Sequence, residues 1–226
     1  MNDLLKAEDL CKTFGPIEAV RRANIQIAPG EFVAVMGRSG SGKTTLLHLL
    51  AGLERPDAGR VLFNGQDVSS LDEDKLALWR RDHIGLVFQA FFLIPTLSAL
   101  ENVAFPLYPS KMPAAERRRR AEERLAQVGL IQRADHRPTR LSGGEQQRVA
   151  IARAIITHPG LILADEPTGN LDSTTEAEIM ALFQRLRQET GAALFIITHD
   201  EKVASGADRI LYMQDGVLSD EKKITS

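Results

Sequence analysis

The chain has 226 residues, with a hydrophobic content of 43% and a charged content of 26%, which are ordinary values for a globular protein. The formal net charge is −2, so we expect no nucleic-acid partner. No window approaches ~20 apolar residues, which argues against a direct membrane span, and the single cysteine excludes an internal disulfide.

The first third of the chain is rich in predicted strands. Loosely alternating apolar residues predict strands over residues 4–14 and 17–27, and residues 59–65 predict a third that ends in an Asn-Gly turn. The fully apolar run 32–36 is typical of a buried parallel strand. Together these segments predict an antiparallel sheet beside a parallel core.

A phosphate-binding loop follows that apolar run. Residues 37–45 match the pattern G-x-x-x-x-G-K-[ST], and residues 45–51 predict a helix that Gly52 stops. Glycines let backbone N–H groups approach phosphate oxygens, Lys43 adds a charge for the outer phosphates, and the Thr44 hydroxyl can reach Mg²⁺. A chance match in a glycine-rich turn is the alternative. The expected phosphate-contacting residues are Gly37, Arg38, Ser39, Gly40, Ser41, Gly42, Lys43, Thr44 and Thr45.

The middle of the chain changes character. Residues 71–81 predict a helix and 84–88 a buried strand, whereas residues 91–113 contain four prolines. Residues 113–128 are strongly helical in composition, and Gly129 lies just past their end. We expect one domain over residues 1–226, with an α/β core of residues 1–90 and 159–226 and a helical subdomain of residues 91–158.

The core pattern resumes after this helical part. Residues 161–164 and 194–198 predict buried strands, and residues 174–189 form an amphipathic helical pattern that Gly191 stops. A closing hairpin is predicted around Asp215-Gly216.

Distinctive polar residues follow the predicted parallel strands. Since ligands bind beyond the carboxyl ends of such strands, these side chains are expected to gather around the loop. Asp165 is assigned to the magnesium shell through water, and Glu166 to orienting or deprotonating an attacking water. His199 is the expected sensor of the terminal phosphate. Gln89 is a candidate catalytic and magnesium-site residue, although taken alone it is better explained as a plain polar residue at a strand end.

A second motif opens the helix predicted over residues 145–157. Ser142 and Glu145 match a capping box, S-x-x-E, and Gly143 and Gly144 lie between them. Two glycines in a first turn weaken a helix, which is understandable if a ligand approaches that N-terminus closely. A plain capped helix is the alternative.

These motifs, in this order, resemble the ATP-binding-cassette (ABC) ATPases over essentially the whole chain. The resemblance is carried by the phosphate loop, Gln89, Leu141–Arg148, Leu161–Pro167, Asn170–Asp172 and His199. It implies a P-loop NTPase (RecA-like) α/β fold with a mostly parallel sheet, an N-terminal antiparallel β subdomain and an inserted helical subdomain. ATP and Mg²⁺ are the implied cofactors, and the implied activity is that of a Mg-dependent ATPase.

The resemblance also implies a head-to-tail homodimer. Ser142, Gly143 and Gly144, with Glu145 beside them, would contact the γ-phosphate of the ATP that the other subunit's Lys43 holds. Asn170, Leu171 and Asp172 would form the loop that links the two sites, and Phe14 would stack on adenine, since an aromatic residue occupies that position in the family.

A finer resemblance, carried by residues 87–103 and 165–172, is to the branch that includes lipoprotein-release, macrolide-export and cell-division ATPases. It implies an integral membrane permease partner that docks near Gln89–Leu97, and a cytoplasmic location on the inner (plasma) membrane face. A mechanotransmitter or regulator of envelope partners that moves no substrate is the alternative. Relatives that act on DNA or ribosomes carry coiled-coil insertions or two cassettes, neither of which is seen here, and the Ser142–Glu145 motif disfavours a kinase or GTPase.

Overall fold

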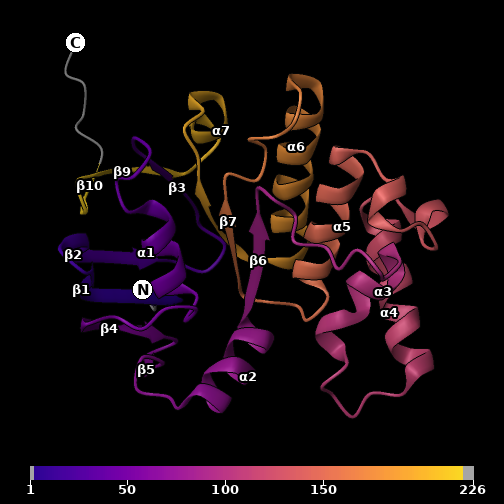
Figure 1. The fold of residues 1–226 in the computed structure, drawn as a ribbon, viewed down its shortest axis with the longest axis horizontal. Coiled ribbons are helices and arrows are strands. Elements are labelled where there is room, and N and C mark those ends of the chain that lie inside the picture. Colours follow the sequence, from indigo (N-terminus) through magenta and orange to yellow (C-terminus); the bar gives the residue numbers. More distant parts are fainter. Residues whose placement is uncertain (1–2, 221–226) are drawn as a thin grey trace.

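The computed structural model describes residues 3–220, so residues 1–2 and 221–226 of the predicted core lie outside the described part. A six-stranded sheet forms its centre, in the order β10-β9-β3-β8-β7-β6 (Figure 1). Strands β3, β6, β7, β8 and β9 run parallel, and β10 closes the edge as an antiparallel hairpin with β9. The bounds are β3 Phe32–Met36, β6 Ile84–Phe88, β7 Leu161–Asp165, β8 Ala193–Ile197, β9 Arg209–Gln214 and β10 Val217–Asp220.

A second sheet of four antiparallel strands has the order β2-β1-β4-β5 and lies at the left of Figure 1. Its strands are β1 Leu5–Phe14, β2 Ile17–Ile27, β4 Ala58–Phe63 and β5 Gln66–Asp67. The turn between β4 and β5 places Asn64 and Gly65 at φ of 49° and 79°, as the Asn-Gly signal predicts. The antiparallel sheet beside a parallel core is therefore confirmed.

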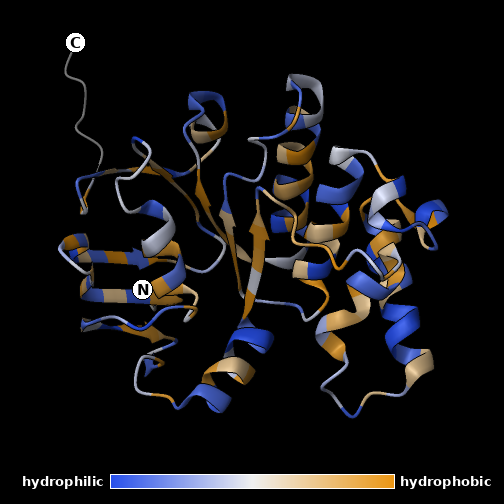
Figure 2. Ribbon diagram, in the orientation of Figure 1, coloured by the Kyte–Doolittle hydropathy of each residue, from blue (hydrophilic) through white to orange (hydrophobic). Residues whose placement is uncertain are grey.

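The central sheet is covered on both faces, and its strands alternate between two apolar cores. Val33, Val35 and Phe195 face the core shared with α1 and the antiparallel sheet. Phe32, Ala34 and their neighbours face a core to which α5, α6, α3 and α4 contribute. Figure 2 shows the resulting apolar strands between more polar helices.

Seven α-helices and three short 3-10 turns complete the described residues. None of these helices combines the length and apolar character that a membrane crossing requires. The α-helices are α1 Lys43–Leu50, α2 Glu73–His83, α3 Ala99–Ala104, α4 Ala114–Gln127, α5 Gly143–Ile155, α6 Ser173–Thr190 and α7 Glu201–Ser205; the 3-10 turns are η1 Phe105–Leu107, η2 Ile131–Arg133 and η3 Pro138–Arg140.

Helices α3 and α7 were not predicted. The prolines around α3 suggest irregular chain, yet Ser98 and Glu101 form a complete capping box that starts it. Asp200 caps α7 by accepting a hydrogen bond from the Lys202 N–H. Both helices are too short to show an apolar period, so their caps were the only local signal.

Candidate functional site

The predicted phosphate loop joins β3 to α1. Gly42 has φ of 102°, and a Cβ there would lie 2.1 Å from the Ala19 carbonyl oxygen. A Cβ on Gly37 would lie 2.2 Å from the Met213 carbonyl oxygen. The loop can therefore take this shape only because glycine occupies both positions.

Lys43 lies inside the loop, and its side chain is buried. Its ammonium donates hydrogen bonds to the carbonyl oxygens of Gly37 and Arg38, at 2.8 and 2.9 Å. Helix α1 begins at this residue without a side-chain cap, so its first N–H groups face the loop without one of their usual partners. A buried cation beside an uncapped helix N-terminus suits a phosphate group.

Thr44 and Asp165 connect the loop to the end of β7. The Thr44 hydroxyl donates to Asp165 Oδ2 at 2.8 Å. Burial raises the pKa of the Asp165 carboxyl above its ordinary value, against the hydrogen bond from Thr44, which lowers it. A hydroxyl and a carboxylate side by side suit Mg²⁺, which takes one or two such ligands together with phosphate oxygens and waters. The residues present therefore fit the predicted ion.

Glu166 follows Asp165 in a left-handed backbone conformation, with φ of 45°. Its Oε2 lies 3.2 Å from His199 Nδ1, beyond the end of β8. A non-glycine residue with this φ is strained and is held by its surroundings, a feature that concentrates at functional sites.

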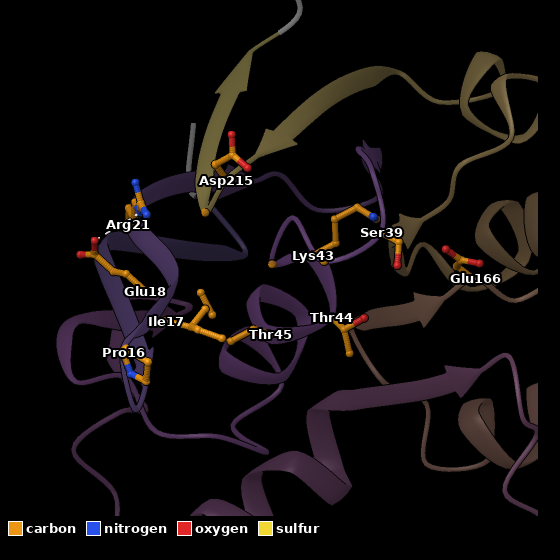
Figure 3. A pocket seen from close by; sticks show the side chains of 14 residues that line it. Pro16, Ile17, Glu18, Arg21, Ser39, Lys43, Thr44, Thr45, Glu166 and Asp215 are labelled. Atoms are coloured by element: carbon orange, nitrogen blue, oxygen red, sulfur yellow. Dashed lines mark ion pairs between the residues drawn. The ribbon is translucent and has the colours of Figure 1, made fainter.

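A cleft of about 420 Å³ opens over the loop (Figure 3). In that view, Lys43 and Thr44 lie between Glu166 on one side and Pro16 and Ile17 on the other. Half of the residues that line the cleft are predicted site residues: Ser39, Gly40, Gly42, Lys43, Thr44, Thr45 and Glu166. The other half are not predicted from the sequence: Pro16, Ile17, Glu18, Ala19, Arg21, Asp215 and Gly216.

The unexpected lining residues come from β2, from the turn that precedes it (Pro16) and from the turn between β9 and β10. They lie beside the loop because the two sheets touch there: the Arg21 N–H of β2, for example, donates to the Gly216 carbonyl oxygen of the hairpin turn at 2.8 Å. Nothing in the local sequence marks them as site residues, except that Asp215-Gly216 is a recognisable turn.

Several predicted site residues do not line this cleft, among them Asp165 and His199. Gly37, Arg38 and Ser41 line a second cavity of about 390 Å³ behind the loop, together with Tyr212 and neighbours. Phe14 is 48% exposed at the end of β1, and the Lys12 ammonium lies 5.4 Å from its ring centroid.

Gln89 is also absent from the lining of the cleft, and its side chain is bonded to Asn170. The Gln89 amide donates to Asn170 Oδ1 at 3.1 Å, and Asn170 Nδ2 donates to the Gln89 carbonyl oxygen at 3.2 Å. Next along the chain, Asp172 caps α6 by accepting from the N–H groups of Thr174 and Thr175. The predicted dimer-communication segment therefore joins Gln89 to the start of α6.

The N-terminus of α5 lies outside the cleft. Ser142 and Glu145 form the predicted capping box, and Arg133 binds Glu145 at 3.0 Å. The hydrogen bond from the Ser142 N–H is the main reason that the pKa of Glu145 is lowered, with Arg133 contributing. Within residues 3–220, none of residues 142–145 lines the cleft above Lys43.

The two glycines of this motif differ in their surroundings. A Cβ on Gly143 would lie 3.5 Å from Leu171 Cδ2, an ordinary contact. A Cβ on Gly144 would lie 2.5 Å from Thr175 Cγ2, so packing against α6 already requires glycine there. Only Gly143 lacks an internal reason to be glycine.

Comparison with known proteins shows what the whole chain is similar to. The sequence model of the ABC transporter family matches residues 20–169. The lipoprotein-releasing system ATP-binding protein LolD of Porphyromonas gingivalis is 44% identical over 96% of this chain and 100% of its own length. The macrolide export ATP-binding/permease protein MacB of Syntrophobacter fumaroxidans is 47% identical over 97% of this chain, but the chain spans only 32% of its length.

The fold has solved counterparts. The ATP-binding cassette MJ0796 of Methanocaldococcus jannaschii, as a post-hydrolysis dimer bound to ADP and Pi, superposes with a TM-score of 0.87 at 44% identity, covering 96% of this chain and 98% of that one. These similarities confirm the P-loop α/β fold, the ATP and Mg²⁺ cofactors and the ATPase class expected from the sequence. The chain therefore belongs to the ABC transporter family, in the branch of its lipoprotein-release and macrolide-export ATP-binding cassettes.

Proposed function

We propose that this cassette binds Mg·ATP between two copies arranged head to tail, and that closure and hydrolysis drive a membrane permease. The observation that carries the proposal is the separation of two phosphate-binding features in one chain. Residues 142–145 do not line the cleft above Lys43. The capped N-terminus of α5 carries Gly143, where a Cβ would make only ordinary contacts within the chain. Each feature suits phosphate, and a second copy would bring them together.

Within one copy, Lys43 and the N-terminus of α1 hold the outer phosphates. Thr44, and Asp165 through a water, would hold the magnesium ion, which when bound supplies positive charge at the phosphate oxygens. The Gln89 side chain would join the ligands of this ion after a small movement away from Asn170. In the structure its amide is bonded to Asn170 instead.

Glu166 orients or deprotonates the attacking water. Its carboxylate lies beside His199, 3.2 Å away, so the imidazole can fix the direction of the carboxylate while contacting the γ-phosphate. Phe14 offers a half-exposed ring and pairs with Ile17, which lines the cleft, and this position fits stacking on adenine.

Across the dimer, Ser142, Gly143, Gly144 and Glu145 of one copy complete the γ-phosphate site of the other. Leu171 lies against Gly143 of its own chain, and Asn170 bonds Gln89. The segment of Asn170, Leu171 and Asp172 therefore touches both the catalytic side and the signature side, which supports its role in linking the two sites.

The permease is proposed to dock on residues 89–97 and the adjoining aromatic surface. Phe92 is 62% exposed, and Phe105 and Tyr108 are about half exposed nearby in the chain. Asn102 is fully buried and ties down this loop, accepting from the Ile94 N–H and donating to the Leu97 carbonyl oxygen. A firmly held loop that exposes an aromatic ring suits a short helix from a partner.

The relatives' names support the membrane partner. LolD belongs by name to a lipoprotein-releasing system, and MacB joins an ATP-binding part to a permease. By this reasoning the cassette works at the cytoplasmic face of the inner membrane, with residues 91–158 as the helical subdomain that meets the permease. The core would then consist of residues 1–90 and 159–226.

ATP-dependent dimerisation of Glu166→Gln tests the proposal. The variant keeps Lys43 and Thr44, so it should bind ATP, but it should not activate water. Light scattering on a sizing column should show a dimer with Mg·ATP and a monomer with Mg·ADP. A monomer with both nucleotides, or a normal rate of hydrolysis, would refute the assigned roles.

A further inference from the structure

Gln147 is a buried polar residue in α5 with no role in the site described so far. Its side chain is fully buried, and its Nε2 donates a hydrogen bond to the carbonyl oxygen of Pro167. Pro167 directly follows Glu166. A side chain of the helix that begins at Ser142 is therefore attached to the residue after the proposed general base.

The chemistry of the two groups fixes the orientation of this amide. A proline carbonyl can only accept a hydrogen bond, so the NH₂ group of Gln147 must face it. The other end of the amide, Oε1, is buried and has no hydrogen-bond partner among residues 3–220. An unpaired buried acceptor costs stability, whereas an apolar side chain of similar shape would not. Filling space therefore does not explain the amide, and the bond to Pro167 does.

The turn that Gln147 holds is the one that sets the position of Glu166. Glu166 has φ of 45°; its N–H donates to the Ile197 carbonyl oxygen at 2.9 Å, and its carbonyl oxygen accepts from the Gly169 N–H at 3.1 Å. Pro167 has no N–H with which to anchor the turn, so its carbonyl is the group available for an outside bond. Strained backbone persists only where its surroundings hold it.

We infer that Gln147 is a positioning residue for Glu166, through its hydrogen bond to the Pro167 carbonyl. The inference rests on the proposed function, because it needs Glu166 to act on the water. It adds a route within one chain: movement of α5, whose N-terminus would meet the partner's ATP, is carried by Gln147 to the turn behind that chain's own Glu166.

Gln147→Met tests the inference, since methionine fills a similar volume and cannot donate. Misplacing a catalytic group by about 1 Å can cost about 100-fold in rate, so we expect kcat to fall about 10- to 100-fold. The KM for ATP and the Kd for the nucleotide should stay within about twofold, because Lys43 and Thr44 are untouched. Gln127→Met is the matched control: it removes the hydrogen bond between Gln127 and Glu189, away from the cleft, and should leave kcat unchanged.

A double-variant cycle with Glu166→Gln separates positioning from general loss of structure. If Gln147 acts through Glu166, adding Gln147→Met to Glu166→Gln should lower the residual rate no further. Two results would overturn this inference without touching the proposed function. One is that Gln147→Met lowers the rate of Glu166→Gln by the same factor as it lowers the wild-type rate. The other is a kcat of Gln147→Met within twofold of wild type. Normal hydrolysis by Glu166→Gln would instead overturn the proposed function.

Gln147→Leu provides a second apolar variant if Gln147→Met does not fold, as judged by nucleotide binding. It should show the same selective loss of kcat. Failure of both variants to fold would mean that the amide serves the fold and not the position of Glu166, which would also overturn the inference.

Discussion

The Thr44 hydroxyl donates a 2.8 Å hydrogen bond to Asp165 Oδ2, and this contact joins the phosphate loop to the end of β7, directly before the proposed general base Glu166. The ionised form of Asp165 is disfavoured in this contact. Burial raises the pKa of its carboxyl group, even though the hydrogen bond from Thr44 lowers it. An ionised carboxylate held there without a metal ion lowers the stability of the nucleotide-free protein.

Asp165→Asn should therefore stabilise the protein in the absence of Mg²⁺ and nucleotide. A raised native pKa means that the folded state binds the proton more tightly, so the wild type loses stability as pH rises from 3.8 through the native pKa. The amide carries no charge and can still accept from Thr44. Scanning calorimetry should give the variant a melting temperature about 2–4 °C above wild type near pH 7.5.

That difference should shrink as the pH falls through the raised native pKa toward 3.8, because protonation removes the charge of wild-type Asp165. The exposed Asp135 provides a control, since Asp135→Asn should not reproduce the pattern. A wild type that is more stable than Asp165→Asn at neutral pH would contradict the unfavourable burial of this carboxylate.

The two signature glycines should respond differently to alanine. In Gly144→Ala, the added Cβ would lie 2.5 Å from Thr175 Cγ2, and overpacking of this kind costs about 1–3 kcal/mol in the free energy of unfolding. In Gly143→Ala, the Cβ finds only ordinary contacts, so stability should be kept or slightly raised.

Hydrolysis by Gly143→Ala should nevertheless fall about tenfold or more, because the added methyl group would occupy the place where the partner's ATP approaches. Thermal melting and steady-state ATPase assays on both variants make the comparison. Full ATPase activity of Gly143→Ala would show that the partner's ATP does not approach Gly143.

Phe92 should control attachment to the membrane partner. Phe92→Ser removes the most exposed ring of the proposed docking surface, and an anchoring aromatic residue contributes enough that binding should weaken about tenfold or more. The measurement is the fraction of cassette that sediments with native membranes. Leu78→Ser, on the comparably exposed Leu78 of α2, should leave that fraction unchanged. Equal losses from both variants would mean that Phe92 has no special place in docking.

Local motifs account for what could be predicted from the sequence. The capping box at Ser142, the Asn64-Gly65 turn and the phosphate loop each depend on neighbouring residues, and each is present as expected. Their chemistry is complete within a few positions, so no knowledge of the fold is needed.

Contacts between distant parts of the chain account for the site residues that local sequence patterns do not predict. Ile17 and Asp215 line the cleft only because β2 and the last hairpin are brought beside the loop. The local sequence does not distinguish Gln147, because a glutamine inside an amphipathic helix is typical of a solvent-exposed position and its partner, Pro167, is distant in the chain. Whether Gly144 is needed for packing or for a ligand likewise depends on Thr175, far along the chain.

The head-to-tail composite site is tested most directly by mixing two inactive variants. Lys43→Ala damages the phosphate loop, and Gly143→Asp places a negative charge at the start of α5, where it suits the helix but should repel the partner's phosphates. Each homodimer then has two defective sites. In a mixed dimer, both defects fall in one site, and the other site consists of two wild-type halves.

Random exchange makes half of the dimers mixed, with one intact site of two. The equimolar mixture should therefore regain about a quarter of the wild-type ATPase rate when each variant alone is nearly inactive. A mixture no more active than its two components measured separately would contradict the composite site.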